Sequence, residues 1–182
     1  MGQFRVVLCV SGEGDVMERY LTLQQIIDNS SWDWTINHLK PFFHVTLEKN
    51  GTYKGRKTLR LTEILRMPAI RMEDRRLLAA KFVKEQKVWI EWACRCAEQD
   101  AKPGSNRRRI QRITALIRRR WRHKALDLCR WYPEDQAVAW AVGTLSGMYP
   151  HQSAQNAAMA AKNLTTDETF EILASVIEEY RR

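Results

Sequence analysis

Alternating hydrophobic and polar residues are confined to the first third of the chain. Residues 4–10 form an apolar, β-rich run that predicts a buried strand. Residues 44–49 and 52–54 alternate on either side of Asn50-Gly51, a pair typical of a tight hairpin turn. Residues 57–61 alternate again. These segments predict a small N-terminal antiparallel or mixed sheet of about three strands.

Elsewhere the apolar residues recur with the period of an α-helix. Residues 16–27 predict a short helix, with Tyr20 and Leu23 on its apolar side. After Pro68 the helical period dominates, and it predicts helices over 72–99, from 105 or 106 to about 131, from Pro133, from Pro150 and from the capping box at Thr165. We therefore expect an α+β, predominantly α-helical protein. A small α+β region (1–68) would precede a bundle of about five helices (69–182), the two packed together as one compact unit.

The helix expected from 107 to 131 has two chemically distinct faces. At 100° per residue, one stripe contains Ile110, Ile113, Ile117, Trp121, Ala125 and Leu128. Arg108, Arg112 and Arg119 lie almost opposite this stripe. The sequence therefore predicts a core-facing side backed by a ridge of guanidinium groups.

The positive charge of the protein comes from this same segment. The whole chain has 30 Lys and Arg, 21 Asp and Glu and a net charge of +9. Residues 101–126 hold ten of the basic residues and no acidic one, so the remainder has 20 basic against 21 acidic residues, a net charge of −1. A solvated helix face normally mixes signs, since opposite charges four residues apart stabilise it. The excess of Arg over Lys also favours two-point contacts with phosphate or carboxylate.

These observations favour a non-enzymatic nucleic-acid-binding protein, such as a subunit of a ribonucleoprotein or DNA-processing complex. The alternative is a regulator, inhibitor or adaptor that docks its basic helix on an acidic protein surface. Small residues over 154–161 would allow close helix approach, internally or in a homo-oligomer. An anionic membrane surface is a weaker third alternative. Trp32 and Trp34 could stack on unpaired bases. The predicted nucleic-acid-binding residues are Arg107, Arg108, Arg109, Arg112, Arg118, Arg119, Arg120, Arg122 and Lys124.

Signatures of catalysis, metal binding and cofactor binding are weak in this sequence. The turn at 11–15 lies between a predicted strand and helix but lacks the glycines and lysine of phosphate-binding loops. Cys94 and Cys96 do not have zinc-knuckle spacing. Scattered carboxylates near the sheet, Glu13, Asp15 and Glu48, leave a nuclease-like site as a remote alternative. We therefore expect no catalytic residues, no metal and no cofactor.

The N-terminus and the cysteines indicate the compartment. The apolar run at 6–10 is too short for a secretory signal, and Val6 does not fit the myristoylation pattern. No apolar run approaches the ~20 residues that span a bilayer. We expect a cytoplasmic protein with no membrane partner and with its four cysteines reduced.

Overall fold

The protein is largely a stack of antiparallel helices. The computed structural model describes residues 20–30, 46–47, 53–54, 58–101, 105–131, 135–146 and 150–180. Most of these residues are helical. The prediction of a predominantly helical protein with a small amount of antiparallel sheet is confirmed, whereas the expected numbers of helices and of strands in one sheet are wrong.

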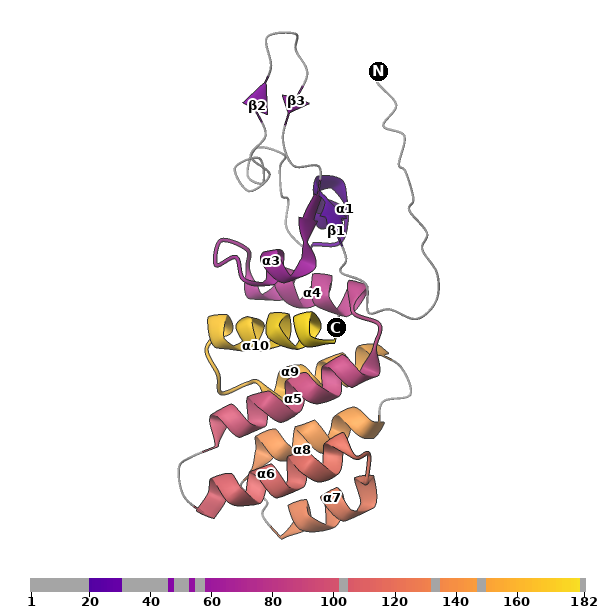
Figure 1. The fold of residues 1–182 in the computed structure, drawn as a ribbon, viewed down its shortest axis with the longest axis vertical. Coiled ribbons are helices and arrows are strands. Elements are labelled where there is room, and N and C mark those ends of the chain that lie inside the picture. The colour runs from indigo at the N-terminus through magenta and orange to yellow at the C-terminus, as the bar shows by residue number, and fades with distance from the viewer. Residues whose placement is uncertain are drawn as a thin grey trace.

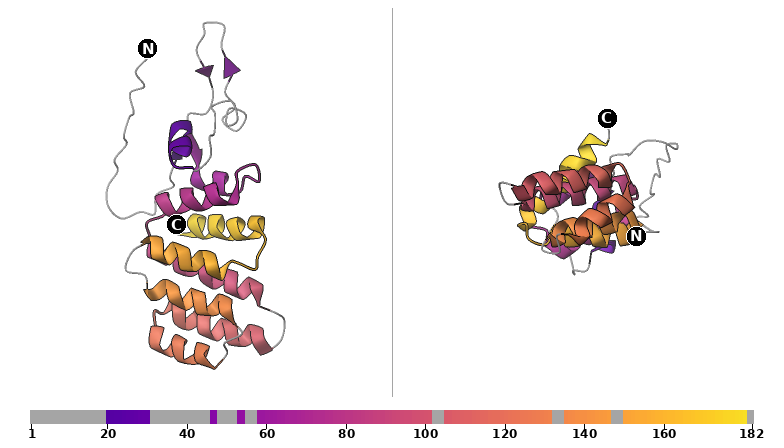
Figure 2. Two further views of the ribbon diagram at one scale, coloured as in Figure 1. Left: turned by 180° about the vertical axis from the view of Figure 1, so that it is seen from behind. Right: turned by 90° about the horizontal axis from the view of Figure 1, so that it is seen from below.

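The helices form two layers that the chain visits in turn (Figures 1 and 2). The chain passes down one side of the stack and crosses its end at α7. It returns along the other layer until its last helix, α10 (Thr166–Glu179), lies against α3 (Leu61–Leu65) and α5 (Gln86–Asp100). The first side consists of α4 (Met72–Phe82), α5 (Gln86–Asp100) and α6 (Ser105–Arg118), the end is α7 (Arg122–Arg130), and the return consists of α8 (Gln136–Gly143), a 3-10 turn (Thr144–Ser146), α9 (Pro150–Ala160) and α10 (Thr166–Glu179).

The β-structure consists of two separate pairs of short strands rather than one sheet of three. β1 (Tyr20–Thr22) pairs with β4 (Thr58–Arg60), and β2 (Thr46–Leu47) pairs with β3 (Tyr53–Lys54), both antiparallel. The second pair confirms the antiparallel pairing predicted for the two strands of the hairpin, whereas the predicted turn at Asn50-Gly51 lies outside the described residues. The predicted strand at 4–10 lies outside the described residues.

The short helix predicted over 16–27 begins later than expected. Leu21 is a strand residue opposite Leu59, and burial of both side chains holds the pair together. Thr22 then caps α1 (Leu23–Asp28) in a reciprocal capping box with Gln25. Local hydrogen bonding at Thr22 therefore starts the helix, although the apolar period continues through the strand. A further short helix, α3 (Leu61–Leu65), follows β4 directly.

The single long helix predicted over 72–99 is two helices. The chain is extended at Val83, where α4 ends, and α5 begins at Gln86. The indole of Trp89 donates a hydrogen bond to the carbonyl oxygen of Val83 at 3.3 Å, so a side chain satisfies a backbone acceptor that the break leaves free. Leu78 of α4 and Trp89 of α5, on either side of the break, are both fully buried.

The arginine-rich helix is also broken in two. Arg120 has a left-handed backbone with φ 58°, and its N–H donates to the carbonyl of Ile117 at 2.8 Å. The N–H of Trp121 donates to the carbonyl of Leu116 at 2.9 Å. These two hydrogen bonds form a Schellman motif that ends α6. The apolar residues keep the same helical period on both sides of the break, so a helical wheel drawn from the sequence does not reveal it. Two such breaks raise the five helices expected after residue 68 to seven among the described residues.

The last two helices, α9 and α10, begin at the residues that the sequence predicts. α10 begins at the predicted capping box, with Thr165 and Glu168 bonding reciprocally, and its Phe170, Leu173 and Val176 are buried. The indole of Trp92 in α5 donates to the carbonyl of Thr169 at 3.0 Å, which joins α10 to the centre of the stack. The helix expected from Pro133 differs, because α8 begins at Gln136.

Candidate nucleic-acid interface

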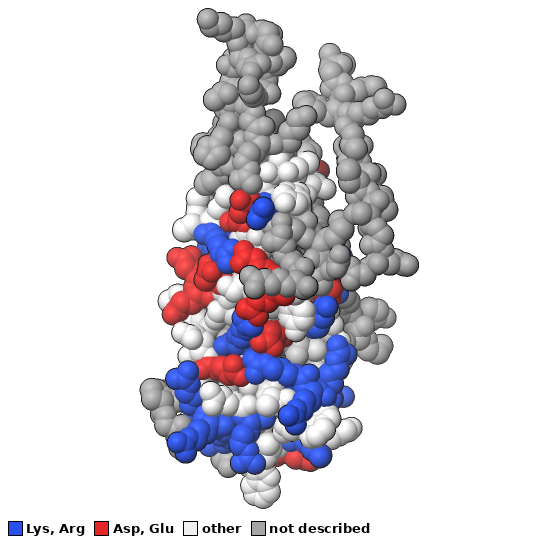
Figure 3. Space-filling view, viewed as in Figure 1, with Lys and Arg blue, Asp and Glu red and all other residues white. Residues whose placement is uncertain are grey.

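The outer face of α6 presents the arginine ridge that the sequence predicts. Ile110, Ile113 and Ile117 are buried, at 4%, 0% and 0% exposure. Arg108, Arg112 and Arg119 are exposed on the other side. Basic side chains gather over α6 and α7 in the surface view, whereas acidic ones mix with basic ones over the helices above (Figure 3). The wheel thus describes α6 correctly even though the helix ends earlier than expected.

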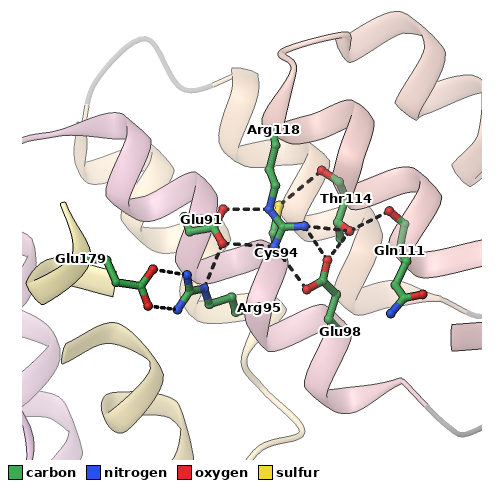
Figure 4. Close-up of polar contacts among 8 residues, drawn as sticks. All are labelled: Glu91, Cys94, Arg95, Glu98, Gln111, Thr114, Arg118 and Glu179. Atoms are coloured by element: carbon green, nitrogen blue, oxygen red, sulfur yellow. Dashed lines mark hydrogen bonds and ion pairs between the residues drawn. The ribbon is translucent and has the colours of Figure 1, made fainter. Parts of the chain in front are cut away.

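Two of the nine predicted binding residues are instead held in internal ion pairs. Arg109 contacts Asp135, with Nη2 and Oδ2 at 2.6 Å and the carboxylate almost fully buried. Arg118 lies between Glu91 and Glu98 of α5, at 2.8 and 2.6 Å (Figure 4). These contacts hold the pKa of Arg118 well above its usual value, although burial of the guanidinium opposes the shift. Arg109 and Arg118 are therefore better described as residues that attach α6 to its neighbours.

The other seven predicted residues are exposed, and no ion pair engages them in the described part of the chain. We call them the basic surface. They come from α6, from α7 and from the turn between the two helices. They are Arg107, Arg108, Arg112, Arg119, Arg120, Arg122 and Lys124.

The positions of these cations are unfavourable for the helices that carry them. Arg107 and Arg108 lie in the first turn of α6, and Arg122 and Lys124 lie in the first turn of α7. Neither first turn contains an acidic residue. The N-terminus of a helix carries a partial positive charge, so cations there cost stability and acids would increase it. Helix formation alone therefore does not account for this arrangement.

Two exposed tryptophans border the basic surface, and the sequence reading missed both. Trp121 was expected in the apolar stripe, but it follows the break at Arg120 and is 47% exposed. Lys124 and Arg119 lie over its ring, with Nζ and Cζ at 4.5 and 5.6 Å from the ring centroid. Trp131 follows α7 and is 78% exposed. The feature of the sequence that could have identified them is their position at the two ends of a short basic segment. The predicted stacking residues Trp32 and Trp34 lie outside the described residues.

The described residues also bear on the weaker alternatives. Among them, no group of three or more His, Cys, Asp or Glu side chains is placed to hold a metal ion. Burial raises the pKa of Cys94 to about 12 and that of Cys129 to about 11, so neither thiol ionises readily at neutral pH. Glu13, Asp15 and Glu48 lie outside this part of the chain. No helix within it is both long and apolar enough to cross a bilayer.

Comparison with known proteins gives no information on the function of this chain. The chain has no significant match among protein families, curated proteins or solved structures.

Proposed function

We propose that this protein binds nucleic acid through the basic surface and does so without catalysing a reaction. The observation that carries the proposal is the crowding of exposed cations, unpaired within the described part of the chain, in the first turns of two adjacent helices. A bound polyanion would supply the negative charge that these helix ends lack. Phosphate groups fit this surface well because arginine binds them in two-point contacts and because helix N-termini attract anions.

The row on α6 has dimensions that suit a phosphate backbone. Arg108 and Arg112 are one turn apart on α6, and Arg119, just past the end of the helix, lies about 16 Å from Arg108 along its axis. A straight helix that carries such a row can lie along a strand or across a groove. Binding of this kind releases counterions, so affinity should fall steeply as salt rises.

Titration of a labelled oligonucleotide at several salt concentrations, followed by fluorescence anisotropy, tests the proposal. Replacing Arg108, Arg112 and Arg119 together by Gln keeps helix propensity and removes three charges. We expect affinity to fall at least about ten-fold at low salt. The slope of log K against log salt should also become shallower by about 2 to 3, close to one unit for each lost phosphate contact.

A matched control removes the same charge from the other end of the stack. Arg76 and Lys81 of α4, and Lys84 just after it, are exposed. Their triple Gln variant should keep nearly the wild-type affinity. The proposal is wrong if wild-type binding is insensitive to salt, or if both triple variants lose affinity equally.

One observation favours a second candidate, an acidic protein surface. Arg109 and Arg118 show that arginines of this segment already bind carboxylates in good geometry. The two candidates separate in affinity capture from nuclease-treated lysate. A stoichiometric acidic protein that remains bound, together with no excess absorbance at 260 nm in the purified protein, would favour the protein partner.

A further inference from the structure

The exposed aromatic rings beside the basic surface indicate which form of nucleic acid it takes. Trp131 is 78% exposed, the highest value among the large exposed hydrophobic side chains in the described part of the chain. Single exposed apolar residues are common on protein surfaces. Here, however, exposed tryptophans occur at both ends of α7, a helix of nine residues with cations in its first turn.

The two rings and a cation lie along one side of α7. Lys124 and Trp131 are seven residues apart, which places them on the same face of a helix. The ammonium of Lys124 also contacts the ring of Trp121 at 4.5 Å. Arg119 approaches the same ring from the end of α6 and so connects this face to the arginine row. Trp121 and Trp131 therefore lie near exposed cations, and the one acid on this side of α7, Asp127, is paired with Arg130.

We infer that the basic surface binds single-stranded nucleic acid, with Trp131 as a stacking platform for an unpaired base and the neighbouring cations on the phosphates. This inference rests on the proposed function and specifies its substrate. Aromatic side chains in a basic path are how proteins hold single strands without reading sequence. A duplex keeps its base faces stacked inside, so an aromatic ring gains little from it unless the ring is inserted.

The length of α7 determines how many nucleotides can lie between the two tryptophan rings. Trp131 lies ten positions after Trp121, which corresponds to about 15 Å along a helix axis. Stacked nucleotides rise about 3.4 Å per step, so the two rings span roughly four steps of a strand. Trp131 is 78% exposed, so most of its ring surface is accessible to a base.

The test compares a labelled single strand of a dozen or so nucleotides with the duplex of the same length and sequence, at one salt concentration. We expect Trp131→Ala to weaken single-strand binding about five-fold or more, the usual effect of losing one stacked base. Duplex binding should change by less than about two-fold, because phosphate contacts remain. Trp131→Phe keeps an aromatic face and should retain most of the single-strand affinity. Quenching of tryptophan fluorescence by the single strand should be smaller in both variants.

Trp140 provides the matched control. It is 40% exposed on α8, outside the basic surface, so Trp140→Ala should leave both affinities nearly unchanged. The inference is overturned if Trp131→Ala leaves single-strand binding intact or weakens both substrates equally. If the arginine variant still loses affinity in that case, the proposed function stands and only the single-strand assignment fails. If neither substrate binds, both fail.

Discussion

At the scale of single residues, Arg120 has the most unusual conformation in the basic surface. It is the one non-glycine residue of the described chain with a positive φ, and it occupies the position of a helix C-cap where glycine is usual. A side chain in the left-handed region costs about 1 kcal/mol. The position therefore carries a cation at the expense of backbone strain.

This strain predicts that Arg120→Gly stabilises the protein. The free energy of unfolding should rise by up to about 1 kcal/mol, measured by urea denaturation, because glycine adopts the left-handed region freely. Arg120→Ala removes the same charge but keeps the strain, so it should give no such gain. Equal stability of the two variants would contradict this explanation. Both should lower affinity for nucleic acid by a similar small factor.

At the scale of secondary-structure elements, charge and helix dipole oppose each other in α6 and α7. Their first turns are basic and contain no acidic residue. In contrast, the first turn of α10 contains Asp167 and Glu168, the arrangement that the dipole favours. The two ends of α6 should consequently respond in opposite ways to the same charge reversal.

We predict that Arg108→Glu stabilises the protein while Arg119→Glu destabilises it. The first change places an acid in the first turn, four residues before Arg112, and should add about 0.5 to 1 kcal/mol. The second places an acid at the carboxyl end of α6 and removes the contact of Arg119 with Trp121. Both variants should bind nucleic acid more weakly than wild type. Thermal unfolding beside anisotropy titration measures both effects, and stability changes of the same sign would contradict the dipole argument.

At the scale of the whole molecule, an ion-pair network joins three helices that are distant in sequence. Glu91 of α5 accepts hydrogen bonds from Arg118 of α6 and from Arg95 of its own helix. Arg95 continues to Glu179 of α10, with Nη2 and Oε2 at 2.5 Å (Figure 4). Glu98 completes the network beside Arg118. The network holds the arginine row of α6 on the stack, so its protonation affects stability.

The pH dependence of stability tests this network through Glu98. Burial favours the neutral form of Glu98, but hydrogen bonds from Arg118 and Thr114 outweigh it and hold the pKa below its ordinary value of 4.5. A carboxyl with a lowered pKa contributes stability above its unfolded pKa, and this contribution disappears as pH falls through the folded value. Glu98→Gln should therefore destabilise the protein at pH 7, and the difference from wild type should shrink below about pH 4.5.

Denaturant unfolding between pH 7 and pH 3 measures this difference. Asp127→Asn, in an exposed ion pair with Arg130 within α7, is the control and should cost little at any pH. A destabilisation by Glu98→Gln that is the same at pH 7 and pH 3 would show that lost packing, and not lost charge, is the cause.

The sequence by itself determined the features that depend on neighbours close along the chain. The buried stripe of α6 follows from the spacing of Ile110, Ile113 and Ile117, and the start of α10 follows from the hydrogen bonds of Thr165 and Glu168. The local excess of positive charge is fixed by composition alone. A helical period and a capping box act over three or four residues, which is why sequence reasoning finds them.

Only the tertiary structure decided where the long helices break and which cations stay free. The period continues through Val83 and through Arg120, so each break depends on hydrogen bonds and burial that the folded chain provides. Arg118 lies 20 and 27 residues from its partners Glu98 and Glu91, which no local pattern connects. The exposure of Trp121 likewise follows from the break before it. These features depend on contacts between distant segments, and such contacts exist only once the helices have packed.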